Sequence, residues 1–361
     1  MSGAARPDPG RQQDALAASR SAAGPPATDP ARAAITPLAV AARAAGSQQV
    51  ILLLVWIGMV VGFTIANSIF FSTAVFSNIL ADWGPTILIA VGETFVIISG
   101  GIDLSVGAVV GFSGVVAAFV MQDLTNANQG SAETLIVGLL VALGVGLGIG
   151  LINAILVTKA KLVPFVATLA TLAAASGMSI VLTGGAPIAG GPADAITLST
   201  PRLGPFSIPV IVVIALVLIL GLFLHKARFG RYTYAIGSNA FAARAAGINV
   251  SRHLTRVYAL SGALAGLAGM FFYLRLGSGA PTSGAGAELD AIAAVVIGGV
   301  ALSGGVGQMA GTVLGALILN TVTSGLIIVG VAPNWKQVVV AILIASAVSL
   351  QGLRRGARSQ T

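Results

Sequence analysis

The sequence predicts an all-α polytopic membrane protein with about ten transmembrane helices, some of them short, broken or re-entrant, and with an internal two-fold repeat. Three observations predict this class: a low charge content, a series of apolar runs, and a Gly-rich motif that occurs twice. Of the 361 residues, 56% are hydrophobic and 8% are charged, whereas a soluble domain carries about 25% charged residues. So few charges could not cover a water-facing surface, which excludes an ordinary soluble enzyme.

The residue content also limits the chemistry. The chain has no cysteine and two histidines, so we expect no disulfide, no metal site and no cofactor. A net charge of +8 would suit nucleic acid, but the basic residues fall in short clusters between apolar runs. Membrane proteins set their orientation in this way. We therefore expect contact with membrane lipid and none with nucleic acid.

The chain divides into a membrane domain and two tails. Residues 1–46 are rich in Ala, Pro, Ser and Arg and cannot bury enough apolar area to offset their ordering entropy. They are predicted to be a disordered cytosolic tail. Residues 47–351 form the predicted membrane domain, and residues 352–361 a short cytosolic C-terminal tail.

Ten apolar runs follow the N-terminal tail. Several reach or approach the ~20 residues that a spanning helix needs, whereas others, above all 289–302, are too short. Short runs interrupted by glycine favour broken or re-entrant helices, which a bilayer tolerates only where protein or water covers the backbone. The runs are 50–69, 83–99, 106–121, 135–157, 165–183, 208–224, 257–274, 289–302, 309–331 and 338–350.

The basic residues support this count and give an orientation. If the runs alternate across the membrane from a cytosolic N-terminus, 16 of the 19 Lys and Arg residues lie on the cytosolic side. Positive residues are enriched on that side of membrane proteins. Both termini and the loop at 225–256 are therefore predicted to be cytosolic.

Two segments share the pattern G-G-x-x-L-S-x-G, at residues 100–107 and 298–305. The pattern could arise by chance in a Gly-rich chain. Alternatively, it marks a duplicated half, as in many transporters, where interrupted segments at matching positions indicate the translocation pathway. On that hypothesis Gly100, Gly101, Gly298 and Gly299 lie along the pathway.

Four acidic residues lie in or beside apolar runs: Glu93, Asp103, Glu288 and Asp290. Charges within a membrane usually line a pathway or pair internally, because burying one is costly. Asp103 could cap a helix through freed amides such as that of Ser105, and Glu288 and Asp290 could stabilise a helix N-terminus. The alternative is a direct role in substrate passage. On that hypothesis the four acids and Ser105 are candidate pathway residues.

No group of residues is typical of catalysis. Both histidines lie in the basic loop, so there is no Ser-His-Asp set, and no G-x-x-x-x-G-K-[ST] sequence is present to hold ATP. The chain is therefore not predicted to be an enzyme.

The loop at 225–256 carries a predicted short helix. The Ala-rich stretch after residue 239 contains strong helix formers, with Ser238 or Asn239 as the cap and Gly247 as the stop. The loop could simply anchor the orientation, or it could dock a cytosolic partner; the apolar Phe241 and Ile248 favour docking. The candidate coupling residues are Arg228, Gly230, Arg231, Asn239, Ala242, Ala243 and Gly247.

Three stretches together resemble one family. Residues 100–107, the loop from 228 to 250, and residues 288–299 resemble, in order, the signatures of ribose-type sugar ABC transporter permeases, and the resemblance covers about 52–350. It implies a subunit of a bacterial inner-membrane importer. Two permease copies would form the channel, two copies of a separate ATPase would dock below, and a periplasmic sugar-binding protein would deliver substrate.

Two features depart from that family. The stretch at 241–247 is similar to the E-A-A-x-x-x-G pattern of importer coupling loops, but Phe241 replaces the acid. A salt bridge from this position is therefore not expected. The long N-terminal tail has no counterpart in compact members.

The leading hypothesis is a permease subunit of an ATP-driven importer of ribose or a related monosaccharide. Residues in its gated conduit would make few and weak contacts with the substrate. The alternative is a proton- or sodium-coupled secondary transporter that uses Glu93 and Asp103 as carriers. A structural or receptor protein without transport is a third possibility. The sequence does not identify the sugar.

Overall fold

The computed structural model describes residues 48–200, 203–332, 334–343 and 345–346. The predicted tails at 1–46 and 352–361 lie outside these residues. The regular secondary structure of the described residues is helical. Turns connect the helices, and the connecting segments contain two isolated β-bridges. The predicted all-α class is confirmed.

Eight of the described helices are long and apolar enough to cross a membrane, which confirms a polytopic membrane protein. They are α3 (Gln48–Ala66), α4 (Thr73–Ile98), α5 (Val106–Asn126), α6 (Ser131–Thr158), α7 (Pro164–Thr183), α9 (Ile208–Lys226), α12 (Val250–Leu276) and α14 (Met309–Ile328).

Two of the ten predicted runs do not appear among these eight. The run at 289–302 overlaps α13 (Ala287–Ile297), which has 11 residues and is too short to span a bilayer. The run at 338–350 lies partly outside the described residues, and its residues 338–343 belong to a helix at 335–343. The count of ten spans stays a prediction.

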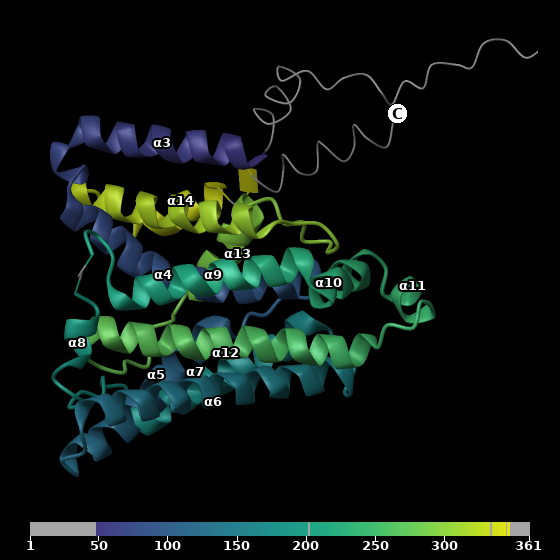
Figure 1. The fold of residues 1–361 in the computed structure, drawn as a ribbon, viewed down its shortest axis with the longest axis horizontal. Helices are drawn as coiled ribbons and strands as arrows, with labels where there is room; N and C mark the ends of the chain where they lie inside the picture. Colours follow the sequence, from purple (N-terminus) through teal and green to yellow (C-terminus); the bar gives the residue numbers. More distant parts are fainter. Residues whose placement is uncertain (1–47, 201–202, 333, 344, 347–361) are drawn as a thin grey trace, which may run out of the picture. The chain divides into compact units, whose positions relative to one another are not determined.

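Helix α12 forms the centre of the packing, with α4, α5 and α6 against it (Figure 1). Helices α6 and α12 meet through small residues, which let their backbones approach closely. A Cβ added to Gly146 would lie 2.2 Å from the carbonyl oxygen of Gly262, and one added to Gly150 would lie 2.4 Å from that of Tyr258. Glycine is therefore required at this contact.

The helices before the two Gly-rich breaks end in the same way. In both, the chain turns through a glycine in the left-handed region, Gly100 after α4 (φ 91°) and Gly299 after α13 (φ 89°). The amide of the following residue, Gly101 or Val300, bonds to the carbonyl five residues back, which is the Schellman motif. The left-handed residue is the first glycine of the first motif but the second glycine of the second. An alignment of the two motifs by sequence is thus shifted by one residue from an alignment of the two helix endings by structure. The two-fold relation between whole halves stays a prediction.

Two short helices, α10 (Arg228–Ser238) and α11 (Ala240–Ala245), follow α9 and lie beside the N-terminal end of α12 (Figure 1). Another short helix, α8 (Ala195–Leu198), contacts the other end of α12, where a Cβ on Gly277 would meet Ile196. The 3-10 helix η2 (Ser68–Phe70) links α3 to α4.

We predict that Gly146→Ala destabilises the protein by about 1–3 kcal/mol, because the added methyl group overlaps the α12 backbone. The control is Gly148→Ala in the same helix, where an added Cβ meets no atom within 4 Å. That change is expected to be neutral or to stabilise by up to about 1 kcal/mol through helix propensity. Thermal unfolding of the purified protein in detergent compares the two. Equal stabilities would contradict the tight α6–α12 contact.

Candidate functional site

Asp103 lies in the break between α4 and α5 and binds four donors. Its Oδ1 accepts hydrogen bonds from the backbone amide of Ser105 at 3.0 Å, from the Ser105 hydroxyl at 2.5 Å and from Nδ2 of Asn153 at 3.4 Å. Its Oδ2 accepts one from the hydroxyl of Ser261 at 3.2 Å. The predicted cap of the Ser105 amide is confirmed. The carboxylate also joins the break to α6 and α12, which supply Asn153 and Ser261.

Glu93 approaches the same break from within α4. Its Oε1 accepts a hydrogen bond from the backbone amide of Asp103 at 3.1 Å. Its Oε2 and the hydroxyl of Tyr258 are buried and have no hydrogen-bond partner among the described residues. A Cβ on Gly101 would lie 2.5 Å from that hydroxyl, so Tyr258 occupies the space over Gly101.

Helix α7 closes the break from a further side. The hydroxyl of Thr168 accepts the amide of Leu104 at 3.1 Å and lies 3.2 Å from the carbonyl oxygen of Ile102. Thr171 donates to Oδ1 of Asn153 at 2.6 Å. Side chains of four helices therefore satisfy the polar groups that the break exposes, as a membrane interior requires.

Five residues form what we call the acid cluster: Glu93, Asp103, Ser105, Asn153 and Ser261. Each is no more than 1% exposed. The structure thus brings together three predicted pathway residues, Glu93, Asp103 and Ser105, but encloses them in protein. Their contacts are those of a support for the broken backbone, and passage of substrate past them stays a prediction.

The two Gly-rich breaks touch each other. The amide of Gly305 donates to the carbonyl of Ile98 at 2.9 Å, and a Cβ on Gly304 would lie 3.1 Å from the Cα of Gly100. Of the other predicted glycines, Gly298 packs against the backbone of α14, and Gly299 lies beside the side chain of Gln48.

Helix α10 is seated on both breaks. A Cβ on Gly237 would lie 1.7 Å from the carbonyl oxygen of Ile98 and 2.6 Å from the amide nitrogen of Gly305. The hydroxyl of Tyr234 donates to the carbonyl of Gly307 at 2.7 Å. Burial raises the pKa of this hydroxyl above its usual value, so it keeps the proton that it donates.

Aromatic rings fix the start of α10. The ring of Phe229 stacks on Phe223 of α9 with centroids 4.8 Å apart, and it also contacts Phe95 of α4 at 5.8 Å and His253 of α12 at 4.5 Å. Gly230 lies against the carbonyl of Leu224, where no side chain would fit. Phe229 therefore connects α10 to three of the long helices, α4, α9 and α12.

The short helix predicted in the loop is confirmed as α11. The side chain of Asn239 accepts the amide of Ala242 at 2.9 Å and caps its start. Gly247, with φ 83°, donates to the carbonyl of Arg244 at 3.0 Å and ends the helix. Of the remaining candidate coupling residues, Ala243 is buried, whereas Arg228, Arg231 and Ala242 are exposed, and Arg231 donates to the carbonyl of Lys226 at 3.1 Å.

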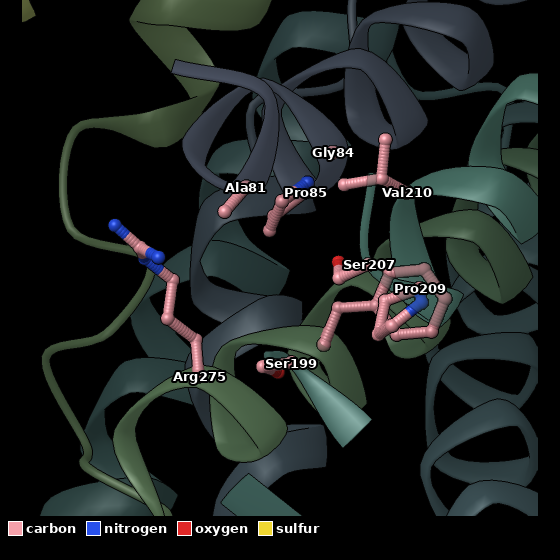
Figure 2. A pocket seen from close by; sticks show the side chains of 9 residues that line it. Ala81, Gly84, Pro85, Ser199, Ser207, Pro209, Val210 and Arg275 are labelled. Atoms are coloured by element: carbon pink, nitrogen blue, oxygen red, sulfur yellow. The ribbon is translucent and has the colours of Figure 1, made fainter. Parts of the chain in front are cut away.

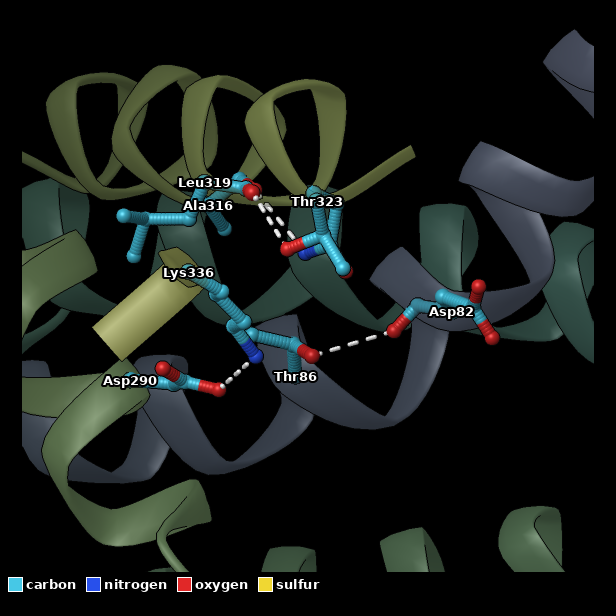
Figure 3. Close-up of polar contacts among 8 residues, drawn as sticks. Asp82, Thr86, Asp290, Ala316, Leu319, Thr323 and Lys336 are labelled. Atoms are coloured by element: carbon cyan, nitrogen blue, oxygen red, sulfur yellow. Dashed lines mark hydrogen bonds and ion pairs between the residues drawn. The ribbon is translucent and has the colours of Figure 1, made fainter. Parts of the chain in front are cut away.

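Glu288 and Asp290 lie in the first turn of α13, as predicted, but do not join the acid cluster. Glu288 occupies the space over Gly107, at the start of α5. Asp290 forms an ion pair with Lys336, with Oδ2 and Nζ 2.6 Å apart (Figure 3). Lys336 belongs to the helix at 335–343, and sequence reasoning had given it no role.

A second ion pair joins α4 to the end of α12. The Nε of Arg275 lies 2.8 Å from Oδ1 of Asp82. Arg275 also borders a cavity of about 10 Å³ between α4 and the start of α9, with its guanidinium directed away from Pro209 and Val210 (Figure 2). This volume suits about one water molecule, so the cavity is no solute site.

Sequence reasoning missed Tyr234, Tyr258 and Ser261 as well as Lys336. One signal was available for α10, because Phe229, Thr233 and Ile236 recur at helical spacing on its buried side. No local signal pairs Ser261 with an acid 158 residues away. Asn153 of α6 bonds across helices to Ser105, whereas the bond from Asn320 is to Ala316 within α14.

We predict that Asp103→Ala destabilises the protein by at least ~2 kcal/mol, because it removes the acceptor of four buried hydrogen bonds. The control is Asp194→Ala, at an exposed position where the carboxylate caps no amide, and it is expected to change stability by less than ~0.5 kcal/mol. Thermal unfolding in detergent measures both. Full stability of Asp103→Ala with loss of transport would instead indicate a direct role in passage.

The family model described as branched-chain amino acid transport system / permease component matches residues 75–348. The ribose import permease protein of Bacillus subtilis is 41% identical over 81% of this chain and 89% of its own length. That of Escherichia coli is 39% identical over 77% and 86%, and the galactose/methyl galactoside import permease protein of Escherichia coli is 36% identical over 79% and 88%. No solved structure matches the chain.

The family model runs from the first turn of α4 through α14 and includes both Gly-rich breaks and the residues that seat α10. The chain therefore belongs to the family of permease components described as branched-chain amino acid transport system / permease component.

Proposed function

We propose that this chain is the transmembrane permease subunit of an ATP-driven sugar importer that carries ribose or a related monosaccharide. The relatives named as ribose and galactose import permeases support the substrate class. The observation that carries the mechanism is the seat of α10 on both Gly-rich breaks, because it links a short surface helix directly to the two interruptions in the bundle.

The proposed coupling runs from the loop at 225–256 into the bundle. A separate ATPase docks on α11 and the exposed side of α10, where Phe241 is 79% exposed. Movement of this surface shifts α10, and α10 displaces both breaks together. The candidate coupling residues Asn239 and Gly247 shape α11, and Gly230 allows α10 to pack against α9.

The proposed pathway lies along the two breaks. Gly100, Gly101, Gly298 and Gly299 give the breaks their turns and close packing, while Glu93, Asp103 and Ser105 hold the first break in place. Glu288 and Asp290 lie at the start of α13, which leads into the second break. Residues in such a conduit bind the sugar weakly, because the solute must also be released.

The proposed assembly contains three further components. A separate ATP-binding cassette subunit hydrolyses ATP, since the permease chain has no G-x-x-x-x-G-K-[ST] sequence. In this proposal the permease chain itself is not an enzyme. A periplasmic sugar-binding protein delivers substrate, and a second permease copy completes the channel. The chain lies in the bacterial inner membrane with both termini in the cytosol, as the distribution of basic residues favours.

The alternative is a secondary transporter in which Glu93 and Asp103 carry ions. The acid cluster offers little support for it. Both carboxylates are enclosed, and both oxygens of Asp103 already accept hydrogen bonds from protein donors. An ion carrier must expose its carboxylate to each side of the membrane in turn.

We predict that sugar uptake follows ATP and not an ion gradient. In cells that express the chain with its partners, collapsing the proton and sodium gradients at high ATP leaves radiolabelled sugar uptake near its starting rate. Depleting ATP with the gradients intact stops it. The reverse pair of results contradicts the importer and supports transport through Glu93 and Asp103.

A further inference from the structure

A cavity of about 350 Å³ lies between the start of α13 and the segment at 334–341. Its volume falls within the range of small-molecule sites. Gly286 and Asp290 border it from α13, and Asn334, Lys336 and Gln337 border it from the other side. The acid cluster takes no part in this cavity.

The lining has the chemistry that a neutral polyhydroxy ligand needs. The Asp290 carboxylate accepts hydrogen bonds, the Lys336 ammonium group donates them, and the carboxamides of Asn334 and Gln337 do both. Leu289 and Val340 supply apolar surface for the C–H groups of a sugar ring. The single acid and the single base cancel, so the lining does not select an anion such as a phosphate headgroup.

The ion pair at this cavity is only partly buried. The side chains of Lys336 and Asp290 are 31% and 23% exposed, so hydroxyl groups can reach both. The backbone carbonyl of Asp82 in α4 accepts a hydrogen bond from the hydroxyl of Thr86 (Figure 3). Asp82 and Arg275 border a second cavity of about 310 Å³ near the end of α14. Each of the two cavities thus has one ion pair in its wall.

We propose that the cavity at the start of α13 is a transient monosaccharide site on the translocation route. Asp290, Lys336, Asn334 and Gln337 bind the sugar hydroxyls, and the sugar lies against Leu289. This inference rests on the proposed function and adds to it a site at which the conduit itself contacts its cargo. A purely structural ion pair would hold the helix at 335–343 against α13 but would bind no sugar.

The natural absence of cysteine allows a direct test. Gln337→Cys places one thiol at an exposed position in the cavity wall. Gln129→Cys is the matched control, at an exposed position in the turn between α5 and α6. Both variants are expressed with their partners and checked for uptake, and the rate of labelling by a water-soluble maleimide is measured in native membranes. The probe is whichever of D-ribose, D-xylose and D-galactose the cells accumulate.

We expect the probe sugar, at ten times its dissociation constant, to slow labelling of Gln337→Cys about tenfold, because only the free site reacts. Labelling of Gln129→Cys stays unchanged. In addition, Gln337→Ala is expected to change the ratio of maximal uptake rates for two transported sugars without changing the amount of protein in the membrane. A merely structural glutamine would leave that ratio unaltered.

Three results would overturn the inference. Sugar uptake with no protection of Gln337→Cys and an unchanged uptake ratio in Gln337→Ala would show that the sugar passes elsewhere, while leaving the proposed function intact. Labelling that is insensitive to sugar but accelerates when lipid is removed would show that lipid fills the cavity. Failure of the unmodified chain to move any of the three sugars would instead remove the proposed function on which the inference rests.

Discussion

The contact of one short helix with two interrupted helices is the interaction on which the rest of the account depends. Gly237 of α10 fits against the end of α4 and against Gly305 in the second break, and Tyr234 bonds to Gly307. Neither break can change shape without moving α10, because no gap separates their backbones. Helix α10 in turn continues into α11 and the exposed Phe241. In the proposed mechanism, a force applied at the surface reaches both breaks through α11 and α10.

The requirement for backbone hydrogen bonds explains why the breaks are supported so heavily. In a membrane domain, free amide and carbonyl groups must find partners within the protein. Around the first break, Asp103 and Thr168 supply them, and Glu93 accepts the amide of Asp103 itself. The second break follows a helix with the same Schellman ending, but alanine stands where the first has Asp103 in the motif. It is supported instead by its contacts with α10 and with the first break. The two breaks thus differ in their support although their helix endings agree.

Much of this architecture could be predicted from the sequence, since it depends on local patterns. The apolar runs predicted the long helices, the short run at 289–302 predicted an interrupted element, and Asn239 and Gly247 predicted the limits of α11. The cap of the Ser105 amide was also a local feature. The partners of Asp103 on α6 and α12 were not predictable, because helix packing and not sequence distance brings Ser261 to the break.

The same limit explains two other outcomes. The repeated sequence motif aligns Gly100 with Gly298. In the structure, however, the left-handed residue that ends α13 is Gly299, so Gly299 is the structural equivalent of Gly100. Asp103 and Asp290 were both candidate pathway residues, each with helix stabilisation as the alternative. In the structure Asp103 is enclosed by donors, whereas Asp290 faces a cavity beside Lys336, and only tertiary structure distinguishes the two environments.

The most direct test of the account measures how tightly ATP hydrolysis and sugar transport are linked when the α10 contact is weakened. Tyr234→Phe removes the bond to Gly307, and Tyr232→Phe, at an exposed position two residues away, is the matched control. In the assembled importer, we predict that Tyr234→Phe raises the ATP consumed per sugar about fivefold, as expected for loss of ~1 kcal/mol, while Tyr232→Phe keeps the normal ratio. A normal ratio in Tyr234→Phe, or an equal rise in both variants, would contradict the role of α10 as the link between the surface and the two breaks.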